Sequence, residues 1–390
     1  MNSQQSSNPN YPEKVEHVYT FQITKGQQPE RVDAFITRSI EHATRNRVQK
    51  AIDRGAVLVN GEVTKANYKI RPGDHLTVTV MKPPPLQLVP EDLPLEVLYE
   101  DQDLLVVNKA AGMPVHPGIG NRVGTLVNAV LWHTGQRQAI DVLQRRESWE
   151  DTDDTDETAY ADDGVLRPGI VHRLDKDTSG VMVVGKSYAV TMALAEQFAQ
   201  RTVSREYVAL AWGVVRDDRR LIEASIGRST RDRTLMQVVD RGGKYAATEV
   251  TVVERYDAAT LVTCNLRTGR THQIRVHLAS VRHPIVGDPG YGGREAAVLA
   301  IHHLYRLQAK AALQVIHRQA LHARSLGFTH PRTGERMEFS APVPADMVEA
   351  ILALRPTGVG PLPPCVTGSQ PLDASHRAMD DRRGSDVDSE

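Results

Sequence analysis

The chain has 390 residues, of which 40% are hydrophobic and 24% are charged, enough for two or three domains with ordinary cores. It contains no apolar run of about 18 residues or more, and its polar start shows no secretory signal. Its two cysteines, Cys264 and Cys365, are far apart. These features argue against a membrane span, a disulfide framework and a cysteine-rich zinc site, and they favour a cytoplasmic protein.

The formal net charge of -1 conceals an uneven distribution of charge. Residues 147–163 carry nine acids and no Lys or Arg, and residues 371–390 carry six acids against three Arg, so the rest of the chain carries a formal charge of +11. A basic body with two acidic appendages fits a polyanionic partner, although ordinary local variation in charge would explain the same numbers.

The first eighty residues predict a small α/β domain that follows a disordered start at residues 1–16. The expected elements are a strand at 17–24, two helices within 31–54 that break near 42–44, strands at 56–60 and 76–80, and turns at Asn60-Gly61 and 71–74. The proline-rich segment 81–94 predicts a linker and a domain boundary.

From residue 95 to about residue 354 the pattern predicts a larger domain with both strands and helices. The expected elements are strands at 95–101, 104–109, 180–186, 207–213 and 259–267, helices at 189–200 and 296–319, and a hairpin around 331–334. The acidic segment 136–164 predicts a flexible surface insertion whose acids would repel a polyanionic partner. The composition of residues 355–390 predicts a disordered tail.

Polar and charged residues are densest at Gly169–Gly180, between two apolar segments. Within this segment Asp175 has cationic neighbours, so it could stay ionised and serve as a nucleophile or a base. From the residues alone, a solvated turn with an incidental ion pair is the simpler explanation.

The same segment closely resembles the HRLDxxTSG motif of the RluA-like pseudouridine synthase family. Further motifs of that family are matched in order between about residues 95 and 345, at Leu104–Pro117, Ser204–Leu210, Leu266–His277, His283–Gly293, Ala320–Ala323 and His330-Pro331. The number and order of these matches make the resemblance specific.

Residues 30–80 resemble a second family, the small S4 RNA-binding domain first described in a ribosomal protein. The matching features are Arg31–Asp33, a basic helix, Gly55–Gly61 and Pro72–Asp74. Enzymes that modify uridines in large-subunit ribosomal RNA typically carry these two domains in this order. The resemblance therefore implies an α+β protein, with a small α/β RNA-binding domain at 17–80 and a larger synthase domain at 95–354 built on a mixed, mainly antiparallel sheet.

The activity that the resemblance implies is the isomerisation of uridine to pseudouridine, without a cofactor or a metal. The N1–C1′ bond is broken and C5 is joined to C1′, after the uridine has left its stack. Asp175 is the implied catalytic carboxylate. Whether it attacks C1′, as a carboxylate does in retaining glycosidases, or removes a proton from C2′ stays open.

The resemblance also assigns partners to Asp175. Arg275 matches the arginine that pairs with the carboxylate; its alternative is a strand arginine in an incidental pair. Tyr207 matches the tyrosine that packs against the uracil and could assist proton removal at C5; its alternative is a core tyrosine. Arg173 matches the arginine that fills the space left by the flipped base; its alternative is a phosphate contact.

Several further side chains are expected to contact RNA. His172 and His272 invite a general-base or metal role, but no third ligand has suitable spacing, so a structural or RNA-contacting role is preferred. In the first domain, the seven-residue spacings 38–45 and 47–54 bring basic residues onto similar helix faces that could contact phosphates, unless they form a solvated surface. The expected RNA-binding set is Arg31, Arg38, Arg45, Arg47, Lys50, Arg54, His172, Arg270 and His272.

Other functions stay open beside this one. A non-catalytic RNA-binding or ribosome-assembly factor is disfavoured by the complete set of Asp175, Tyr207 and Arg275, and the same chemistry on transfer RNA is an alternative substrate choice. A glycoside hydrolase would need a second catalytic carboxylate, for which Asp177 has no matching role. The expected state is a monomer that acts on ribosomal RNA or on an assembling large subunit.

Overall fold

The computed structural model describes residues 15–40, 43–82, 87–118, 120–138, 140–141, 169–356 and 358–368. The start of the chain, most of the acidic segment 136–164 and the tail beyond 368 lie outside these residues, so the predictions made for them are not tested. Contacts divide the described chain into two units. The first contains the chain up to Leu93 with residues 116–138, and the second contains Pro94–Val115 and the chain from residue 169 onward.

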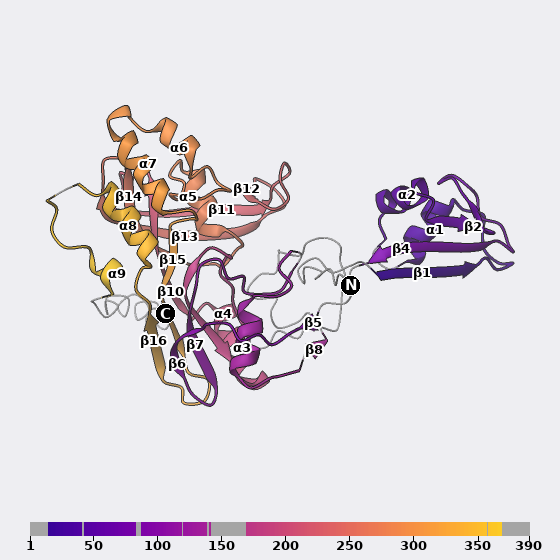
Figure 1. Ribbon diagram of the computed structural model, residues 1–390, viewed down its shortest axis with the longest axis horizontal. Helices are drawn as coiled ribbons and strands as arrows, with labels where there is room; N and C mark the ends of the chain where they lie inside the picture. The colour runs from indigo at the N-terminus through magenta and orange to yellow at the C-terminus, as the bar shows by residue number, and fades with distance from the viewer. Residues whose placement is uncertain are drawn as a thin grey trace, which may run out of the picture. The chain divides into compact units, whose positions relative to one another are not determined.

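The first unit begins with a four-stranded antiparallel sheet in the order β1-β4-β2-β3 and two helices on one of its faces (Figure 1). Its elements are β1 (Val15–Gln22), α1 (Val32–Ser39), α2 (Arg45–Asp53), β2 (Val57–Val59), β3 (Glu62–Val63) and β4 (His75–Lys82). Val32, Ile36 and Val48 from the helices pack on Val57 and Leu76 from the sheet. This packing confirms the predicted pair of helices and the strands around them.

The turn between β2 and β3 also confirms its prediction. Leu58 pairs with Val63 and Val59 pairs with Glu62, which leaves a two-residue loop. Asn60 and Gly61 have φ angles of 53° and 86°. Two residues with positive φ form the turn whose twist matches that of the flanking strands, and Asn-Gly is the pair that adopts it most readily.

The predicted linker at 81–94 contains regular structure, and the chain after Val115 returns to it. β5 (Gln87–Leu88) pairs with β8 (Ile140–Asp141). In α3 (Leu126–His133), Asn128 donates from Nδ2 to the carbonyl oxygen of Val89 at 2.7 Å. These bonds explain why residues 116–138 group with the first unit, whereas the predicted boundaries placed them in the larger domain.

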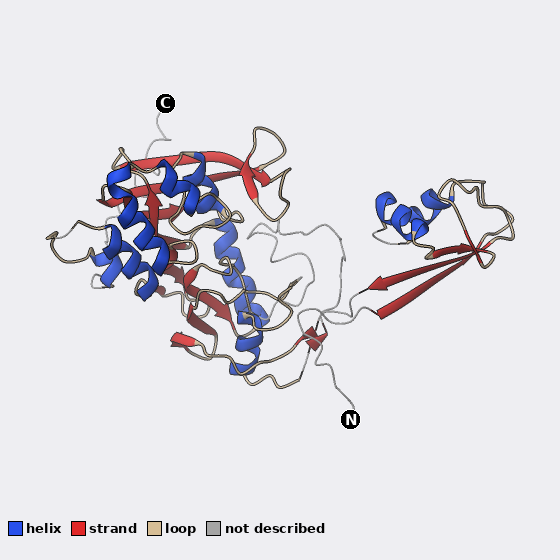
Figure 2. Cartoon of the chain, turned by 45° about the horizontal axis from the view of Figure 1, so that its top comes forward, coloured by secondary structure: helices blue, strands red, loops and turns tan. Residues whose placement is uncertain are grey.

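The second unit is built on a ten-stranded sheet with the order β12-β11-β13-β14-β10-β15-β9-β7-β6 and β16 paired to β15. Figure 2 shows the strands of this unit in red and its helices in blue. The strands are β6 (Glu96–Glu100), β7 (Leu104–Lys109), β9 (Ser179–Gly185), β10 (Ser204–Trp212), β11 (Arg219–Arg228), β12 (Met236–Val238), β13 (Lys244–Arg255), β14 (Ala259–Leu266), β15 (Leu321–Thr329) and β16 (Arg336–Ser340). Among these strands only β9 and β15 pair in parallel. The predicted mixed, mainly antiparallel sheet is therefore confirmed, and so is the hairpin around 331–334.

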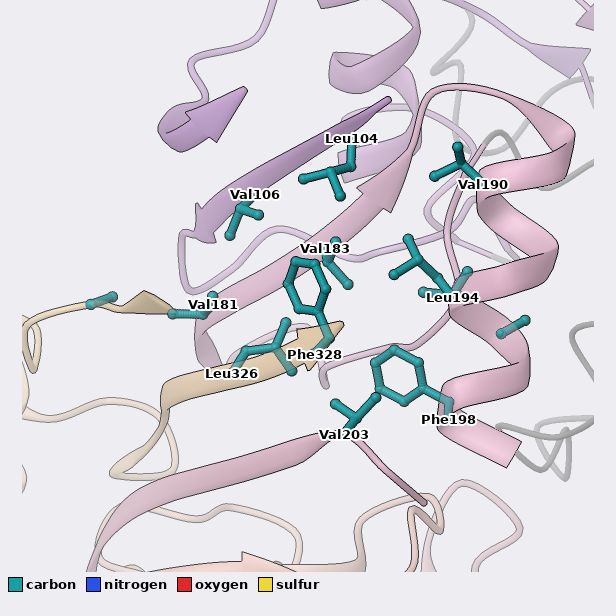
Figure 3. Packing of buried hydrophobic residues seen from close by; sticks show 13 residues of the cluster. Leu104, Val106, Val181, Val183, Val190, Leu194, Phe198, Val203, Leu326 and Phe328 are labelled. Carbon is teal, nitrogen blue, oxygen red and sulfur yellow. The ribbon is translucent and has the colours of Figure 1, made fainter. Parts of the chain in front are cut away.

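Helix α4 (Tyr188–Gln200) covers one part of this sheet. Leu194 and Phe198 on its inner face pack against Val183 of β9 and Phe328 of β15, as Figure 3 shows. Val171 belongs to the same buried cluster and lies in the segment that leads to Asp175. Truncation of a buried Leu or Phe typically costs about 2–5 kcal/mol, so this core stabilises the segment that leads to Asp175.

The remaining helices are α5 (Gln273–Ser280), α6 (Glu295–Ala300), the 3₁₀ turn η2 (His303–Tyr305), α7 (Arg306–Val315), α8 (Ala345–Leu354) and α9 (Pro364–Thr367). The predicted helical stretch at 296–319 is thus interrupted. The prediction of a disordered tail from residue 355 is wrong for residues 358–368, because Arg355 donates to the carbonyl oxygens of Gly360 and Pro361 and Val366 is 2% exposed. No helix in the described parts of the chain is long and apolar enough to cross a membrane.

Candidate active site

Asp175 lies in the loop that precedes β9, and several contacts fix the path of this loop. Val171 and Leu174 are buried, and the amide of Thr178 donates to the carbonyl oxygen of Asp175 at 3.0 Å. At Gly180, where φ is 128°, a Cβ atom would lie 2.1 Å from the carbonyl oxygen of Ala323. Only glycine therefore allows the close parallel pairing of β9 with β15 that holds the end of the loop.

Arg275 joins Asp175 to a second, fully buried carboxylate. Its Nη1 donates to Oδ2 of Asp175 at 2.8 Å, while its Nε and Nη2 donate to the two oxygens of Asp288 at 2.7 and 2.9 Å. A bidentate pair of this kind fixes the plane of the guanidinium. Asp288 therefore holds Arg275 so that one N–H points at Asp175.

The surroundings of Arg275 explain how a helix presents it. Val276 of α5 packs with Ile226, Met236 and Ala246 in a small buried cluster beneath β11, β12 and β13. Because Val276 faces this cluster, its neighbour Arg275 projects from another side of α5 toward Asp175. Arg275 is thus a helix residue and not the strand residue of the alternative, and its functional role stays a prediction.

The charges around Asp175 favour its ionised form. Burial opposes ionisation, but the electrostatic effects of His272 and Arg275 outweigh it and hold the pKa of Asp175 below its usual value of 3.8. The carboxylate is still 18% exposed, so it remains open to a ligand in the pocket. Asp175 is therefore a carboxylate at neutral pH, as a nucleophile or a base must be.

The pocket at Asp175 brings together most of the residues expected in the site. Its lining includes Tyr207 from β10, Leu321 from β15, Gly269 and Gln273, together with the expected residues Arg173, Asp175, Arg270, His272 and Arg275. Arg270 is tied to the wall by a bond from Nε to the carbonyl oxygen of Tyr245 at 3.1 Å. The lining combines a tyrosine ring, one carboxylate and several cations, which suits a base attached to a sugar and phosphates.

His172 lies in the core and not at the pocket. It is 2% exposed, its ring stacks on Phe198 at 4.6 Å between centroids, and its Nε2 accepts a hydrogen bond from the amide of Val183 at 3.1 Å. Burial lowers the pKa of His172 to about 3, so the ring is neutral. The structural alternative is therefore correct for His172, and the RNA contact expected of it is wrong.

Two residues that contact Arg275, Asp288 and Tyr291, were not among the expected site residues. Both lie in the His283–Gly293 segment that matched a family motif, and that match was the available signal. The amides of Gly290 and Tyr291 donate to Oδ1 of Asp288 at 2.9 and 3.2 Å, which fixes the position of this carboxylate beside Arg275. The Arg275 guanidinium lies 4.9 Å from the centre of the Tyr291 ring.

Lys109 stabilises the loop that carries Asp175. Its side chain is almost fully buried, and Nζ donates to the carbonyl oxygens of Ala110, Met113 and Lys176 at 2.8, 2.9 and 3.1 Å. Burial lowers the pKa of Lys109 to about 7, although the nearby carboxylates of Asp175 and Asp177 act in the opposite direction. An ammonium with three acceptors thus joins the end of β7 to the backbone next to Asp175.

This buried lysine predicts a pH dependence of stability. The unfolded chain binds more protons at Lys109 than the folded chain between about pH 7 and 10.5, so the free energy of unfolding rises with pH in this window. Lys109→Met removes the titration. The difference in free energy of unfolding between the wild type and this variant should shift in favour of the wild type by up to about 1.4 kcal/mol per pH unit. Urea unfolding at pH 7, 8 and 9 measures this shift. A constant difference across these pH values would contradict the assignment.

The basic residues of the first domain fall into two groups. Arg31 and Arg45 lie 2.8 and 3.5 Å from Asp33, and Arg38 lies 2.5 Å from Glu30. Arg38 and Arg45 belong to different helices, so their seven-residue spacing does not define one face and that prediction is wrong. The other group, Arg47 and Lys50 of α2 with Arg54 at its C-cap, lines one hollow beside β4.

Among the described residues, three could together offer ligand atoms to a metal, namely Asp101, Asp103 and His330. Their hydrogen bonds give them another role. Asp101 accepts from the amides of Asp103 and Leu104 and from Nε2 of His330, and Arg332 pairs with Asp103. These bonds connect the start of β7 to the β15–β16 hairpin. We therefore interpret the three residues as a structural network.

Comparison with known protein families agrees with this geometry. A family model described as RNA pseudouridylate synthase matches residues 103–280, and the S4 domain model matches residues 30–76. The first match contains Asp175, Tyr207 and Arg275, and the second contains α1, α2 and the turns between β2 and β4.

Curated relatives extend the similarity over most of the chain. An uncharacterised RNA pseudouridine synthase of Bacillus subtilis is 43% identical over 85% of this chain and 96% of its own length. Ribosomal large subunit pseudouridine synthase D of Neisseria meningitidis is 40% identical over 83% of this chain and 79% of its own. The chloroplastic RNA pseudouridine synthase 2 of Arabidopsis thaliana is 40% identical over 84% and 81%.

The chain therefore belongs to the RNA pseudouridine synthase family. Within that family it is an RluA-like synthase with an N-terminal S4 domain. Its activity is the isomerisation of uridine in RNA.

Proposed function

We propose that the chain converts uridines of large-subunit ribosomal RNA to pseudouridine, with Asp175 as the catalytic carboxylate. One observation carries this proposal: Asp175 is ionised, partly exposed in a pocket, and bound through only one oxygen to an arginine that Asp288 holds in place. The name of the Neisseria relative supports ribosomal RNA of the large subunit as the substrate. A location in the cytoplasm and a monomeric state belong to the same proposal.

Each residue of the pocket has a task in this proposal. The target uridine leaves its stack and enters the pocket, where the ring of Tyr207 packs against the uracil and Arg173 occupies the space that the base has left. Asp175 reacts at the sugar, either at C1′ or at the C2′ proton, and the N1–C1′ bond breaks. The uracil turns, C5 bonds to C1′, and the proton at C5 is lost while N1 gains one. Tyr207 is placed to assist that proton transfer.

Basic side chains at the pocket wall and on the S4 domain, with His272, hold the RNA by its phosphates. Arg270 and His272 lie on the pocket wall, and the S4 domain adds Arg31, Arg38, Arg45, Arg47, Lys50 and Arg54. Arg47, Lys50 and Arg54 form the strongest candidate contact, because they share one side of α2. Such contacts fix the register of the RNA and make binding depend on salt.

The proposed substrate is tested by mapping pseudouridines chemically. Large-subunit, small-subunit and transfer RNA from a strain that lacks the enzyme are each incubated with purified wild type and with Asp175→Asn. New sites confined to large-subunit RNA and absent with the variant are the expected result. New sites confined to transfer RNA would replace the substrate in the proposal, and bound RNA without new sites would favour the ribosome-assembly factor.

The role of α2 gives a separate prediction. Replacement of Arg47, Lys50 and Arg54 by Gln should weaken RNA binding and reduce the slope of log K against log salt by about 2, since each phosphate contact contributes about 0.7 in single strands. Turnover at saturating RNA should stay near that of the wild type. The matched control replaces Lys25, Lys65 and Lys69, which are exposed elsewhere in the domain, by Gln. An equal loss of slope in both triple variants would contradict a specific surface on α2.

A further inference from the structure

His272 occupies an unusual position next to Asp175. It is the N-cap residue of α5, with φ 54° and ψ 20°, and its side chain lines the pocket. The left-handed conformation costs a non-glycine residue about 1–2 kcal/mol. Residues held in such conformations cluster at functional sites, where the surrounding structure maintains them.

The hydrogen bonds of Tyr291 determine which nitrogen of His272 carries the proton. The amide of Met236 donates to Oη of Tyr291 at 2.9 Å, and Oη lies 2.8 Å from Nδ1 of His272. A phenol that accepts from an amide still has its own proton to donate. Burial raises the pKa of Tyr291 to about 12, so that proton stays on the phenol. The phenol can donate this proton to Nδ1 of a neutral His272, which then carries its hydrogen on Nε2. A charged His272, whose electrostatic effect favours the Asp175 carboxylate, carries a hydrogen on Nε2 as well.

The protonated nitrogen faces the catalytic carboxylate. Nε2 of His272 lies 3.9 Å from Oδ1 of Asp175, whereas Arg275 binds the other oxygen, Oδ2. A separation of 3.9 Å is too long for a direct hydrogen bond, but a small movement of either side chain would close it. The two oxygens of Asp175 thus face different partners, and Oδ1 is the one that Arg275 does not bind.

We propose that His272 is a positioning residue of the reaction: Tyr291 fixes its tautomer so that Nε2–H holds Oδ1 of Asp175 in place and stabilises the carboxylate. This inference rests on the proposed catalytic role of Asp175. It gives the Tyr291 hydroxyl a task that packing alone does not explain, because Met236 and His272 both bind it.

Two substitutions at His272 separate this role from a structural one. The amide of Gln can place an N–H where Nε2 lies, whereas the shorter amide of Asn can replace only Nδ1. Asn adopts the left-handed conformation more readily than Gln. A purely structural role therefore predicts that His272→Asn is the better tolerated variant, and a role of Nε2–H predicts the opposite.

The experiment measures the single-turnover rate and the RNA dissociation constant of each variant. At saturating RNA, where a lost RNA contact does not affect the rate, we expect His272→Asn to react about 10- to 100-fold more slowly, the range for the loss of a hydrogen bond to a charged group. His272→Gln should stay within about fivefold of the wild-type rate. Equal rates for the wild type and His272→Asn, or a faster Asn than Gln variant, would overturn the inference.

Tyr291→Phe adds an independent test. In the wild-type background it should lower the single-turnover rate, because the imidazole loses its fixed tautomer. In the His272→Gln background it should have little further effect on the rate, because an amide has no tautomer to fix. A double-mutant cycle measures this coupling, and additive effects would contradict it. Asp175→Asn serves as the control in the same assay. If it reacts like the wild type, the proposed function fails; if it is inactive and the His272 variants react like the wild type, only the inference fails.

Discussion

Asp175→Asn is expected to reduce pseudouridine formation by about 10⁴-fold or more, the scale seen when a nucleophile or its charge is removed from an active site. The amide keeps the size of the side chain but has no negative charge, so it can neither attack C1′ nor take a proton from C2′ at a useful rate. Its oxygen can still accept the hydrogen bond from Arg275, which Asp288 continues to hold. The fold should therefore survive.

The measurement compares single-turnover rates with RNA affinities for the same preparations. The dissociation constant of Asp175→Asn for RNA should match that of the wild type, because the contacts to phosphates are unchanged. Its free energy of unfolding should differ by only about 1 kcal/mol, the typical value of one partly exposed hydrogen bond. If Asp175→Asn retains a tenth of the wild-type rate, Asp175 is not the catalytic carboxylate.

The parts of this site that the sequence foretold are those carried by contiguous motifs. Asp175, Tyr207 and Arg275 are far apart in the chain, and composition or periodicity could not have joined them; the family resemblance did. The fold class followed from the same resemblance. The sequence analysis did not predict the long strands β11 and β13, and no quoted family motif covers them. Their side chains are half exposed, and the pattern of such strands depends on neighbours that are distant in sequence.

Tertiary packing explains most of the residues that the sequence analysis placed wrongly. His172 stands beside Arg173 in a charged motif, yet it is buried while Arg173 lines the pocket, because a side chain's direction in a loop depends on tertiary packing. The apolar neighbours Ile170 and Val171 were the available hint. Arg38 and Arg45 share a seven-residue spacing, but the chain turns between α1 and α2, so a regular spacing says nothing once the helix has ended.

Asp288→Ala should be the most damaging substitution outside the reacting groups. Asp288 has no exposed surface and accepts four hydrogen bonds, two of them from Arg275. Its removal leaves a buried guanidinium with Asp175 as its remaining carboxylate partner. Breaking a buried ion pair in this way typically costs about 3–5 kcal/mol. We expect a loss of stability of that size in urea unfolding and a fall in the single-turnover rate of about 100-fold, because Arg275 no longer holds Asp175 in one position.

Glu254→Ala provides the matched control for Asp288→Ala. Glu254 binds Arg355 at 2.9 to 3.0 Å, but the carboxylate is 19% exposed and the pair lies outside the pocket lining. Arg355 also keeps the carbonyl oxygens of Gly360 and Pro361 as acceptors. This variant should lose less stability and keep the wild-type rate. If both variants lose stability equally and neither loses rate, Asp288 contributes only to the fold; a rate lost at Asp288 alone would show that the buried carboxylate sets the geometry of the catalytic pair.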